Sequence, residues 1–428
     1  MNITRRMFVK GALGVGASAW LGGCGDEDGG AGGGDAGATG ADAGVTGGGV
    51  DTGFGADSGG VPTCEDPFAG GELLEQIAFQ RREDDASVFH QAYNQGHDGR
   101  LLTDLSVVEP GVETIPNEHF YIRTLYPDQL DHQPGDPWEI HLHGLVAQER
   151  RVLLSDLEEF IEPMGAFVLE CSGNSPYGGF GLMSAATWDG IPIARLLEQV
   201  TPTEDAVGVE IAGFDLHSTT STHSTPGASW IYTFDQLSDA GAFLATHMNG
   251  VPLPPDHGFP VRLYTPNWYG CCCIKWLNAV RFVGIDEPAS AQMREFARRT
   301  HQPGADVAPP DLAREYRAAT MDQAAMPVRL ERWRDADGAL VYRIIGIMWG
   351  GYALTDALTL RFNPDEAPVP VDVCPPQRDN LGWTVWTHAW RPDAPGAYRL
   401  RCQIADPSVP TLRLDRGYYD RDVVITEV

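Results

Sequence analysis

Residues 248–262 read Met248-Asn249-Gly250-Val251-Pro252-Leu253-Pro254-Pro255-Asp256-His257-Gly258-Phe259-Pro260-Val261-Arg262. A second segment precedes them, residues 167–174, in which Cys171 stands where a hydrophobic stretch gives way to a loop with Gly and Asn. A third follows, residues 269–277, and reads Tyr-Gly-Cys-Cys-Cys-Ile-Lys-Trp-Leu. Glycine beside a cysteine lets the backbone approach a bound group, and a thiolate there can bind a metal. Taken alone, this motif favours a buried structural cysteine.

In this order the three segments resemble signatures of the sulfite oxidase family of molybdenum-cofactor enzymes. These signatures are Glu-Cys-x-Gly-Asn, Met-Asn-Gly-x-x-Leu-Pro-x-Asp-His-Gly-x-Pro-Val-Arg and Gly-x-x-x-x-Lys-Trp-Leu. Weaker support comes from residues 120–123, 187–190 and 227–229, and the resemblance runs from roughly residue 90 to the end of the chain. It implies an oxidoreductase of α+β fold, with a molybdopterin-binding domain followed by an Ig-like β-sandwich through which two copies form a homodimer.

The resemblance also implies a set of site residues. Cys171 matches the thiolate that binds molybdenum beside the pterin dithiolene, and a soft sulfur donor suits a metal that changes oxidation state. A phosphate inside an acidic protein needs cations and N–H donors. The positions that match the family's contacts to the pterin and its phosphate are Arg123, His257, Arg262, Cys273 and Lys275. The alternative for each charged residue is an ordinary ion pair. Arg123 and Cys171, together with Tyr177 and His247, are also expected to be catalytic.

Two departures from the family pattern bear on the substrate. Sulfite-oxidising members place arginines directly after the cysteine loop, whereas this chain has Ser175-Pro176-Tyr177. They also carry a tyrosine before Met-Asn-Gly, where this chain has Ala245-Thr246-His247. We expect Tyr177, His247 and Thr246 to form a different polar lining, the alternative being that they only support the loops. An arginine expected from the C-terminal domain is not evident around residues 383–386.

The substrate therefore stays open. A hydrogen bond from arginine to an oxoanion contributes about 1.5–3 kcal/mol, so losing two would weaken sulfite binding by orders of magnitude. Two-electron oxygen-atom transfer with sulfite oxidation is the family default. One alternative is a reductase of a sulfoxide or another oxo substrate. An alternative of a different class is a non-catalytic surface lipoprotein that retains the fold.

The other cysteines and two histidines have less specific interpretations. Residues 271–273 are consecutive cysteines, which cannot all point at one metal from an extended strand, and a vicinal disulfide is an alternative. Cys374 and Cys402 are candidates for a disulfide in an oxidising compartment. His141 and His143 alternate on an expected strand and share one face. We expect a solvated face there rather than a metal site.

The first 62 residues are interpreted as an address and a tether. Residues 4–10 carry paired arginines before a weakly hydrophobic run, which is typical of a twin-arginine signal, and a basic N-terminal arm is the alternative. Leu21-Gly22-Gly23-Cys24 resembles a lipobox in which Cys24 receives lipid. Residues 1–24 are thus the expected signal and residues 25–62 a Gly-rich acidic linker. The prediction is a periplasmic protein, lipid-anchored to the membrane.

Charge and missing motifs limit the partners. Thirty Lys and Arg against fifty-nine Asp and Glu give a net charge of −29, which excludes a surface-wide attraction to nucleic acid or anionic lipid. The sequence contains neither a Cys-x-x-Cys-His haem attachment site nor a cytochrome b5-like His-Pro-Gly-Gly segment. No haem is therefore expected in this chain. Electrons would pass to an external carrier, such as a small basic c-type cytochrome.

The folded part is expected to have two domains. Residues 63–300 mix helical patterns with short strands and form the expected molybdopterin-binding domain, residues 301–326 a connector, and residues 327–428 the Ig-like domain. The expected helices cover residues 153–160 and 192–200. The expected strands cover residues 138–145, 207–211, 261–264, 328–333, 341–348, 358–362, 383–390, 397–404 and 422–426.

Overall fold

The fold is taken from a computed structural model. The structure describes residues 66–81, 87–221, 225–305, 316–376 and 379–428. The expected signal in residues 1–24, with Cys24, and the linker in residues 25–62 lie outside the described residues and stay predictions. No helix within the described part is long and apolar enough to cross a membrane.

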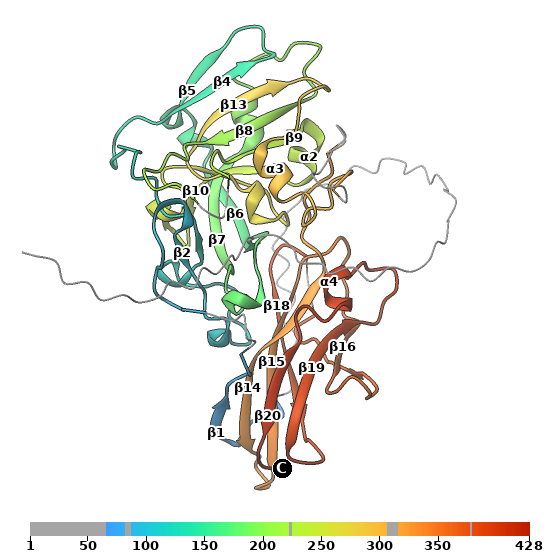
Figure 1. Ribbon diagram of the computed structural model, residues 1–428. Coiled ribbons are helices and arrows are strands. Elements are labelled where there is room, and N and C mark those ends of the chain that lie inside the picture. Colours follow the sequence, from blue (N-terminus) through green and yellow to red (C-terminus); the bar gives the residue numbers. More distant parts are fainter. Residues whose placement is uncertain (1–65, 82–86, 222–224, 306–315, 377–378) are drawn as a thin grey trace, which may run out of the picture.

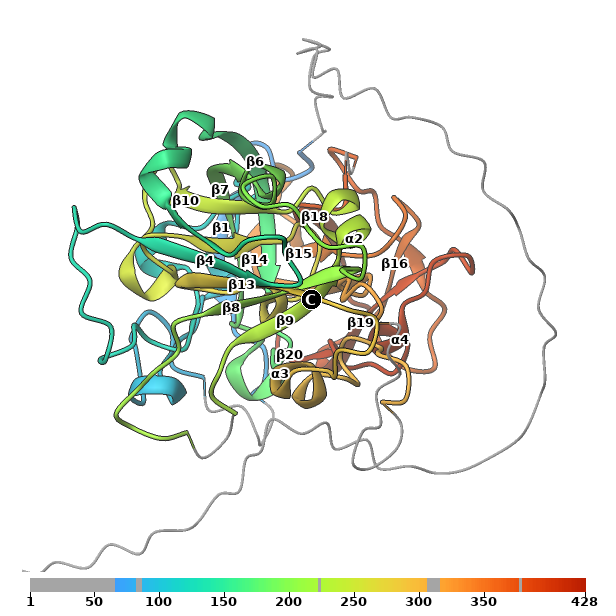
Figure 2. The ribbon, with the colours of Figure 1, turned by 90° about the horizontal axis from the view of Figure 1, so that it is seen from above.

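Two five-stranded sheets form the first part of the molecule (Figure 1). The first sheet contains β6 (Glu162–Glu170), β7 (Met183–Pro192), β10 (Phe243–Met248), β11 (Val251–Pro252) and β12 (Arg262–Tyr264). The second contains β4 (Glu139–Gly144), β5 (Arg150–Leu153), β8 (Gly208–Gly213), β9 (Ser229–Thr233) and β13 (Leu277–Val283). In the second sheet β13 runs parallel to β4 and antiparallel to β8, and Figure 2 shows these three strands side by side. β2 (Arg100–Leu101) and β3 (Ile122–Arg123) form a separate two-stranded antiparallel ribbon.

Helices are few and short. The α-helices in the described residues are α1 (Ile193–Leu197), α2 (Phe234–Asp239), α3 (Ala291–Glu295) and α4 (Leu412–Asp415). The 3-10 helices are η1 (Gly96–Asp98), η2 (Leu105–Val107), η3 (Asn117–His119), η4 (Leu154–Phe160), η5 (Pro176–Gly178), η6 (Pro255–His257) and η7 (Gly270–Cys272). The helix expected over residues 153–160 is thus a 3-10 helix. The fold consists mostly of strands with a few short helices. The predicted α+β class is therefore correct only in the sense that both kinds of element are present.

The second part consists of two four-stranded antiparallel sheets that pack on each other through β14 and β19. One contains β1 (Glu72–Ile77), β14 (Ala324–Arg334), β15 (Leu340–Trp349) and β18 (Thr384–Trp390). The other contains β16 (Leu358–Arg361), β17 (Val369–Pro370), β19 (Gly396–Ile404) and β20 (Arg421–Ile425). All six strands expected after residue 327 are present. Apolar residues alternate in β16, as expected for a strand with one buried face, whereas β14 and β15 contain long runs buried on both faces.

One strand lies in a different part from the one expected. β1 pairs antiparallel with β14, with ion pairs from Glu72 to Arg334 and from Glu75 to Arg332. Figure 1 shows it, in blue, among the orange and red strands of the second part. The predicted range 63–300 for the first domain therefore includes a strand that belongs to the C-terminal sheet. Such a pairing joins distant residues, so local periodicity does not reveal it.

The C-terminal cysteines do not pair with each other. Cys374 is disulfide-bonded, whereas Cys402 on β19 is buried and not disulfide-bonded. The suggested Cys374–Cys402 bridge is therefore wrong. Cys402 is part of the hydrophobic core, where it packs as a small apolar side chain.

His141 and His143 lie on the same face of β4, as their spacing predicts. Their rings are stacked with centroids 4.5 Å apart, and His141 Nε2 lies 3.3 Å from Glu149 Oε2. Among the described residues, no group of three or more His, Cys, Asp or Glu side chains is arranged to hold a metal ion.

Candidate active site

A cleft in the first part brings together side chains from several elements. It contains about 840 Å³ of empty space, including the portion open to solvent. The six residues expected to contact the cofactor all line it, and they are Arg123, Cys171, His257, Arg262, Cys273 and Lys275. Strand β3, the end of β6, helix η6, strand β12 and the segment after η7 supply them.

Cys171 directly follows β6 and is held by a tight turn. Its Sγ accepts a hydrogen bond from the Gly173 N–H at 3.4 Å, and its carbonyl accepts one from the Asn174 N–H at 2.9 Å. The thiol is buried and not disulfide-bonded. Cys171 belongs to a hydrophobic cluster that includes Phe243 and Tyr264. The side of the cleft that carries the thiol is therefore well packed.

Arg262 and His257 are both buried in the floor of the cleft. Arg262 donates from Nη1 to the His257 carbonyl at 3.1 Å and from Nη2 to the Cys273 carbonyl at 2.8 Å. Its Nε is buried and has no hydrogen-bond partner among the described residues. Burial, with Lys275 and Arg262 nearby, lowers the pKa of His257 to about 3, so this imidazole is neutral at physiological pH.

The glycine after His257 explains part of the long sequence segment. Gly258 has a φ of 113°, and a Cβ there would lie only 3.0 Å from the Cβ of Arg262. Both the backbone conformation and the space therefore require glycine. This turn lets His257 and Arg262 reach the same cleft from η6 and β12.

Lys275 is a half-buried cation whose ammonium donates to backbone carbonyls. Its Nζ donates to the carbonyls of Thr124 and Asp256 and lies 4.3 Å from the centre of the Trp276 ring. Burial is the main cause, and the positive charge of Arg262 the second, that lowers the pKa of Lys275 to about 7. A bound anion would favour the protonated form and offset both effects.

This environment predicts a pH dependence for anion binding. In the full chain prepared without cofactor, sulfate affinity should be constant below about pH 7 and fall by up to about tenfold per pH unit above it, because binding must then protonate Lys275. His257 stays neutral throughout, since its pKa is about 3. Titration calorimetry between about pH 6 and pH 9 measures the effect.

Lys275→Arg is the matched control, because a guanidinium stays charged at these pH values. Its sulfate affinity should not change with pH. Equal pH profiles for the wild type and this variant would rule out Lys275 as the titrating group.

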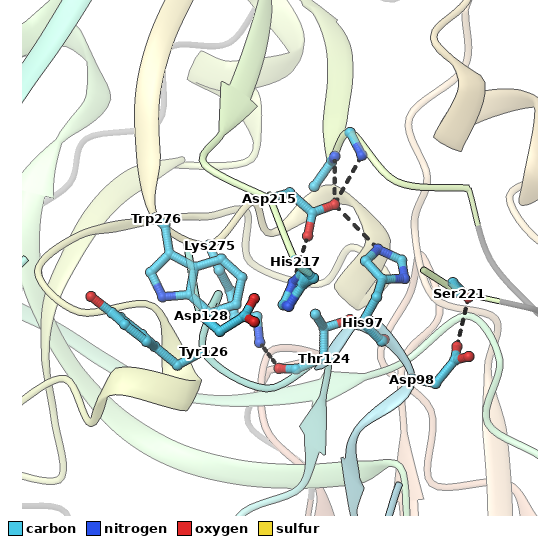
Figure 3. A network of polar contacts seen from close by, with 12 residues as sticks. His97, Asp98, Thr124, Tyr126, Asp128, Asp215, His217, Ser221, Lys275 and Trp276 are labelled. Atoms are coloured by element: carbon cyan, nitrogen blue, oxygen red, sulfur yellow. Dashed lines mark hydrogen bonds and ion pairs between the residues drawn. The ribbon is translucent and has the colours of Figure 1, made fainter. Parts of the chain in front are cut away.

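A polar cluster that sequence reasoning did not single out borders the same cleft (Figure 3). The Asp215 carboxylate lies 3.2 Å from Nε2 of both His97 and His217, and it accepts the N–H groups of Gly227 and Ala228. Burial opposes ionisation of Asp215, but hydrogen bonds from His217 and His97 hold its pKa below the usual range. His97 is 118 residues away from Asp215 in the chain, so spacing carries no signal of this contact.

Arg123 is anchored beside this cluster. Its Nη1 donates to the His97 carbonyl at 2.6 Å and to the Thr124 hydroxyl at 3.1 Å. Tyr121, two residues earlier, also lines the cleft, and burial together with Cys171 raises the pKa of its phenol. The phenol therefore stays protonated and is able to donate a hydrogen bond. Sequence reasoning used this segment only for Arg123.

Three expected polar residues do not line the cleft. Tyr177 lies on η5 and is 53% exposed. His247 lies on β10 with its Nδ1 3.0 Å from the Thr246 hydroxyl, and neither residue is part of the cleft lining. The pairing of β10 with β7 shifts register between Ala245 and His247. Such a bulge changes the direction of the following side chains, and it depends on strand pairing that the sequence does not reveal. Proximity in sequence to the cleft residues therefore did not place these side chains in it.

The three consecutive cysteines are not disulfide-bonded. Cys271 and Cys272 have sulfur atoms 3.6 Å apart, and Cys271 and Cys273 both line the cleft. The alternative of a vicinal disulfide is thus not what the structure shows. Burial raises the pKa of Cys273 to about 11, so its thiol is protonated.

Comparisons with known proteins agree with this site. Residues 127–291 match the family model described as "Oxidoreductase molybdopterin binding domain". "Nitrate reductase [NADPH]" of Beauveria bassiana is 28% identical over 279 residues, which is 58% of this chain and 30% of that protein. "Sulfite oxidase, mitochondrial" of Mus musculus is 28% identical over 258 residues, 55% of this chain and 44% of that protein, and the Macaca fascicularis protein of the same name is 30% identical over 198 residues, 42% and 35% respectively.

A solved structure shares the fold over most of the chain. The crystal structure of the sulfane dehydrogenase SoxCD from Paracoccus pantotrophus matches with a TM-score of 0.56 at 15% identity, covering 82% of this chain and 91% of that one. The chain spans less than half the length of the three curated relatives named above. The matched domain and its thiol-bearing, cationic cleft define an oxidoreductase that binds molybdopterin. Over about half of its length the chain is similar to proteins named sulfite oxidase and nitrate reductase.

The cleft residues fit such a cofactor. They combine a thiol that is not disulfide-bonded, three basic side chains and one buried guanidinium nitrogen, Nε of Arg262, that has no partner among the described residues. A pterin phosphate needs these donors, and molybdenum needs the sulfur.

Proposed function

We propose that this protein is an exported molybdenum oxidoreductase that carries out two-electron oxygen-atom transfer on a small oxoanion, with sulfite oxidation as the first activity to test. One observation carries the proposal: the Cys171 thiol opens into the same cleft as Arg123, Arg262 and Lys275. A purely structural cysteine has no need of three cations in the same cavity. Curated relatives named sulfite oxidase match 42% and 55% of the chain.

Each cleft residue has a proposed role. Cys171 would hold molybdenum as a thiolate, and Arg262 and Lys275, with neutral His257 and the Cys273 thiol nearby, would hold the pterin and its phosphate. When bound, molybdopterin supplies a metal that accepts and returns two electrons. Arg123 would orient an oxoanion by charge, which favours anionic over neutral substrates.

Tyr121 would serve as a hydrogen-bond donor in the reaction. Its phenol lines the cleft and stays protonated because burial raises its pKa. The Tyr121 hydroxyl and the Cys171 Cα both pack against Gly270: a Cβ at that position would lie 2.8 Å from the hydroxyl and 3.5 Å from the Cα. The hydroxyl is therefore close to Cys171. The Tyr121 hydroxyl would donate a hydrogen bond to a substrate oxygen near the Cys171 thiol.

A second candidate, reduction of a sulfoxide or another oxo substrate, is favoured by the loop after Cys171. That loop carries no cation, and Tyr177 at its tip is turned outward. A neutral substrate would not need the arginines that sulfite-oxidising members of the family place directly after this loop.

Location and partners complete the proposal. Export by the twin-arginine route and a lipid on Cys24 would place the protein in the periplasm, which incorporation of labelled palmitate in the wild type but not in Cys24→Ala tests. The two C-terminal sheets would form an Ig-like sandwich that pairs two copies, which the solution mass of the purified chain tests. Because no haem motif stands in the sequence, a small basic c-type cytochrome would accept the electrons, guided by the net charge of −29.

A steady-state assay with two substrate classes tests the reaction. The expected result is turnover of sulfite with a basic c-type cytochrome as acceptor, and a rate of cytochrome reduction that falls steeply as ionic strength rises, because screening weakens the attraction between the acidic chain and the basic carrier. The same preparation is assayed with sulfoxides and a reduced electron donor.

The outcomes separate the candidates. Turnover of sulfoxides without sulfite oxidation would select the reductase. Inactivity toward both in molybdenum-replete protein would favour a different oxo substrate or the non-catalytic lipoprotein. A cytochrome rate that is independent of salt would exclude electrostatic guidance.

A further inference from the structure

Glu170, the last residue of β6, is a carboxylate buried directly before the thiol residue Cys171. Its exposed fraction is 1%. Its Oε1 accepts hydrogen bonds at 2.9 Å and 3.3 Å, and its Oε2 accepts one at 2.9 Å. The groups around the carboxylate are Arg299 Nη2 and Asn174 Nδ2 at Oε1, Trp349 Nε1 at Oε2, and the Tyr419 hydroxyl 3.5 Å from Oε1.

These groups come from separate parts of the molecule. Asn174 belongs to the turn that carries Cys171, whereas Trp349 ends β15 and Tyr419 follows α4 in the C-terminal part. Arg299 follows α3 and has its only charged partner among the described residues in Glu170. The hydroxyl of Tyr418 donates to the Asn174 carbonyl at 2.9 Å. The C-terminal part therefore contacts the cysteine turn through hydrogen bonds to Glu170 and Asn174.

The two neighbouring side chains point to different sides. Successive side chains of an extended segment alternate in direction. Cys171 lines the cleft, whereas Glu170 is absent from the cleft lining and faces the C-terminal strands. Glu170 does not touch the space where substrate or cofactor would bind, so any effect it has on the chemistry acts through Cys171.

We propose that Glu170 is a positioning residue: it ties the turn of Cys171 to the C-terminal sheet and so fixes the thiol in the cleft. A buried ion pair contributes little to net stability, because desolvation of the two charges offsets their attraction. Its place beside the thiol and its bond to Asn174 instead supply geometric specificity. The consequence for metal binding rests on the proposed function, whereas the effect on the thiol does not.

The chain contains a matched control in the C-terminal sheet. Glu331 on β14 is also buried, with Arg329 Nε 2.8 Å from its Oε1 and Trp333 Nε1 donating to its Oε2 at 2.8 Å. Glu331→Gln removes the same kind of buried charge without touching the cysteine turn.

The test measures thiol reactivity in the full chain matured without molybdate. Iodoacetamide labelling followed by mass spectrometry gives separate rates for Cys171 and for buried Cys402, which reports general opening. Glu170→Gln should raise the Cys171 rate at least about tenfold, the effect of losing one net hydrogen bond to a charged group. The reason is that the loosened turn lets the reagent reach the buried thiol. The Cys402 rate should not change, and Glu331→Gln should leave the Cys171 rate unchanged.

Two results would overturn the proposal: an unchanged Cys171 rate in Glu170→Gln, or equal increases at Cys171 and Cys402. If Glu170→Gln does not fold, Trp349→Phe decides, because it removes the indole N–H that joins Glu170 Oε2 to β15. A rise specific to Cys171 then supports the proposal and no rise overturns it. Molybdenum in wild-type protein matured with molybdate is measured in parallel. Its absence contradicts the proposed function, while the labelling rates still decide the role of Glu170.

Discussion

Replacing Cys171 by alanine is expected to remove both molybdenum and activity. The thiol is buried, is not disulfide-bonded and sits at a cleft with three basic side chains. Loss of an outer partner of a metal ligand already costs about 10- to 100-fold in affinity or activity, so loss of the ligand itself should reduce activity below about 1% of the wild type. Metal analysis by mass spectrometry and pterin fluorescence measure the cofactor directly.

Cys273→Ser is the control for this prediction. Cys273 lines the same cleft, but burial raises its pKa to about 11, so it is a protonated thiol and a poor metal ligand. This variant should keep its molybdenum. If Cys171→Ala kept molybdenum while Cys273→Ser lost it, the assignment of the two thiols would be reversed.

Replacing Arg262 by methionine is expected to have the second-largest effect, on stability and on cofactor retention together. The guanidinium donates to the carbonyls of His257 and Cys273, and its removal leaves two buried acceptors without a donor. Hydrogen bonds to charged groups contribute about 1.5–3 kcal/mol each, so the free energy of unfolding should fall by about 3 kcal/mol. Chemical denaturation measures that change, and the molybdenum content should fall in the same preparation.

Two further variants sharpen this prediction. Arg262→Lys keeps the charge but loses the two-pronged geometry, and it should retain part of the cofactor. Arg195→Met removes an exposed arginine whose ion pair with Glu198 lies on the surface, and it should change stability by less than about 0.5 kcal/mol. If Arg262→Met matched Arg195→Met in stability and kept its cofactor, the floor of the cleft would not depend on Arg262.

The sequence contained much of the site because its residues lie in short segments. Cys171 follows a buried strand directly, and His257 and Arg262 are joined by a turn that needs Gly258. Within such a segment, local geometry fixes the relation between side chains. The C-terminal strands were predictable for a similar reason, since alternation of apolar residues is a local property.

The remainder depends on contacts between distant residues. Strand β1 pairs with β14, and His97 meets Asp215, only in the folded chain. Tyr177 and His247 are neighbours of cleft residues in sequence, yet strand register and turn direction carry them out of the lining. Glu170 could be read as part of a motif, but its bonds to the C-terminal strands required the structure.

Molybdenum and pterin analysis of the wild-type protein tests the central claim most directly. The protein is produced in a host that makes the cofactor, and metal is measured per chain. We predict one molybdenum per chain with pterin present. Absence of both molybdenum and pterin from this preparation would contradict the account.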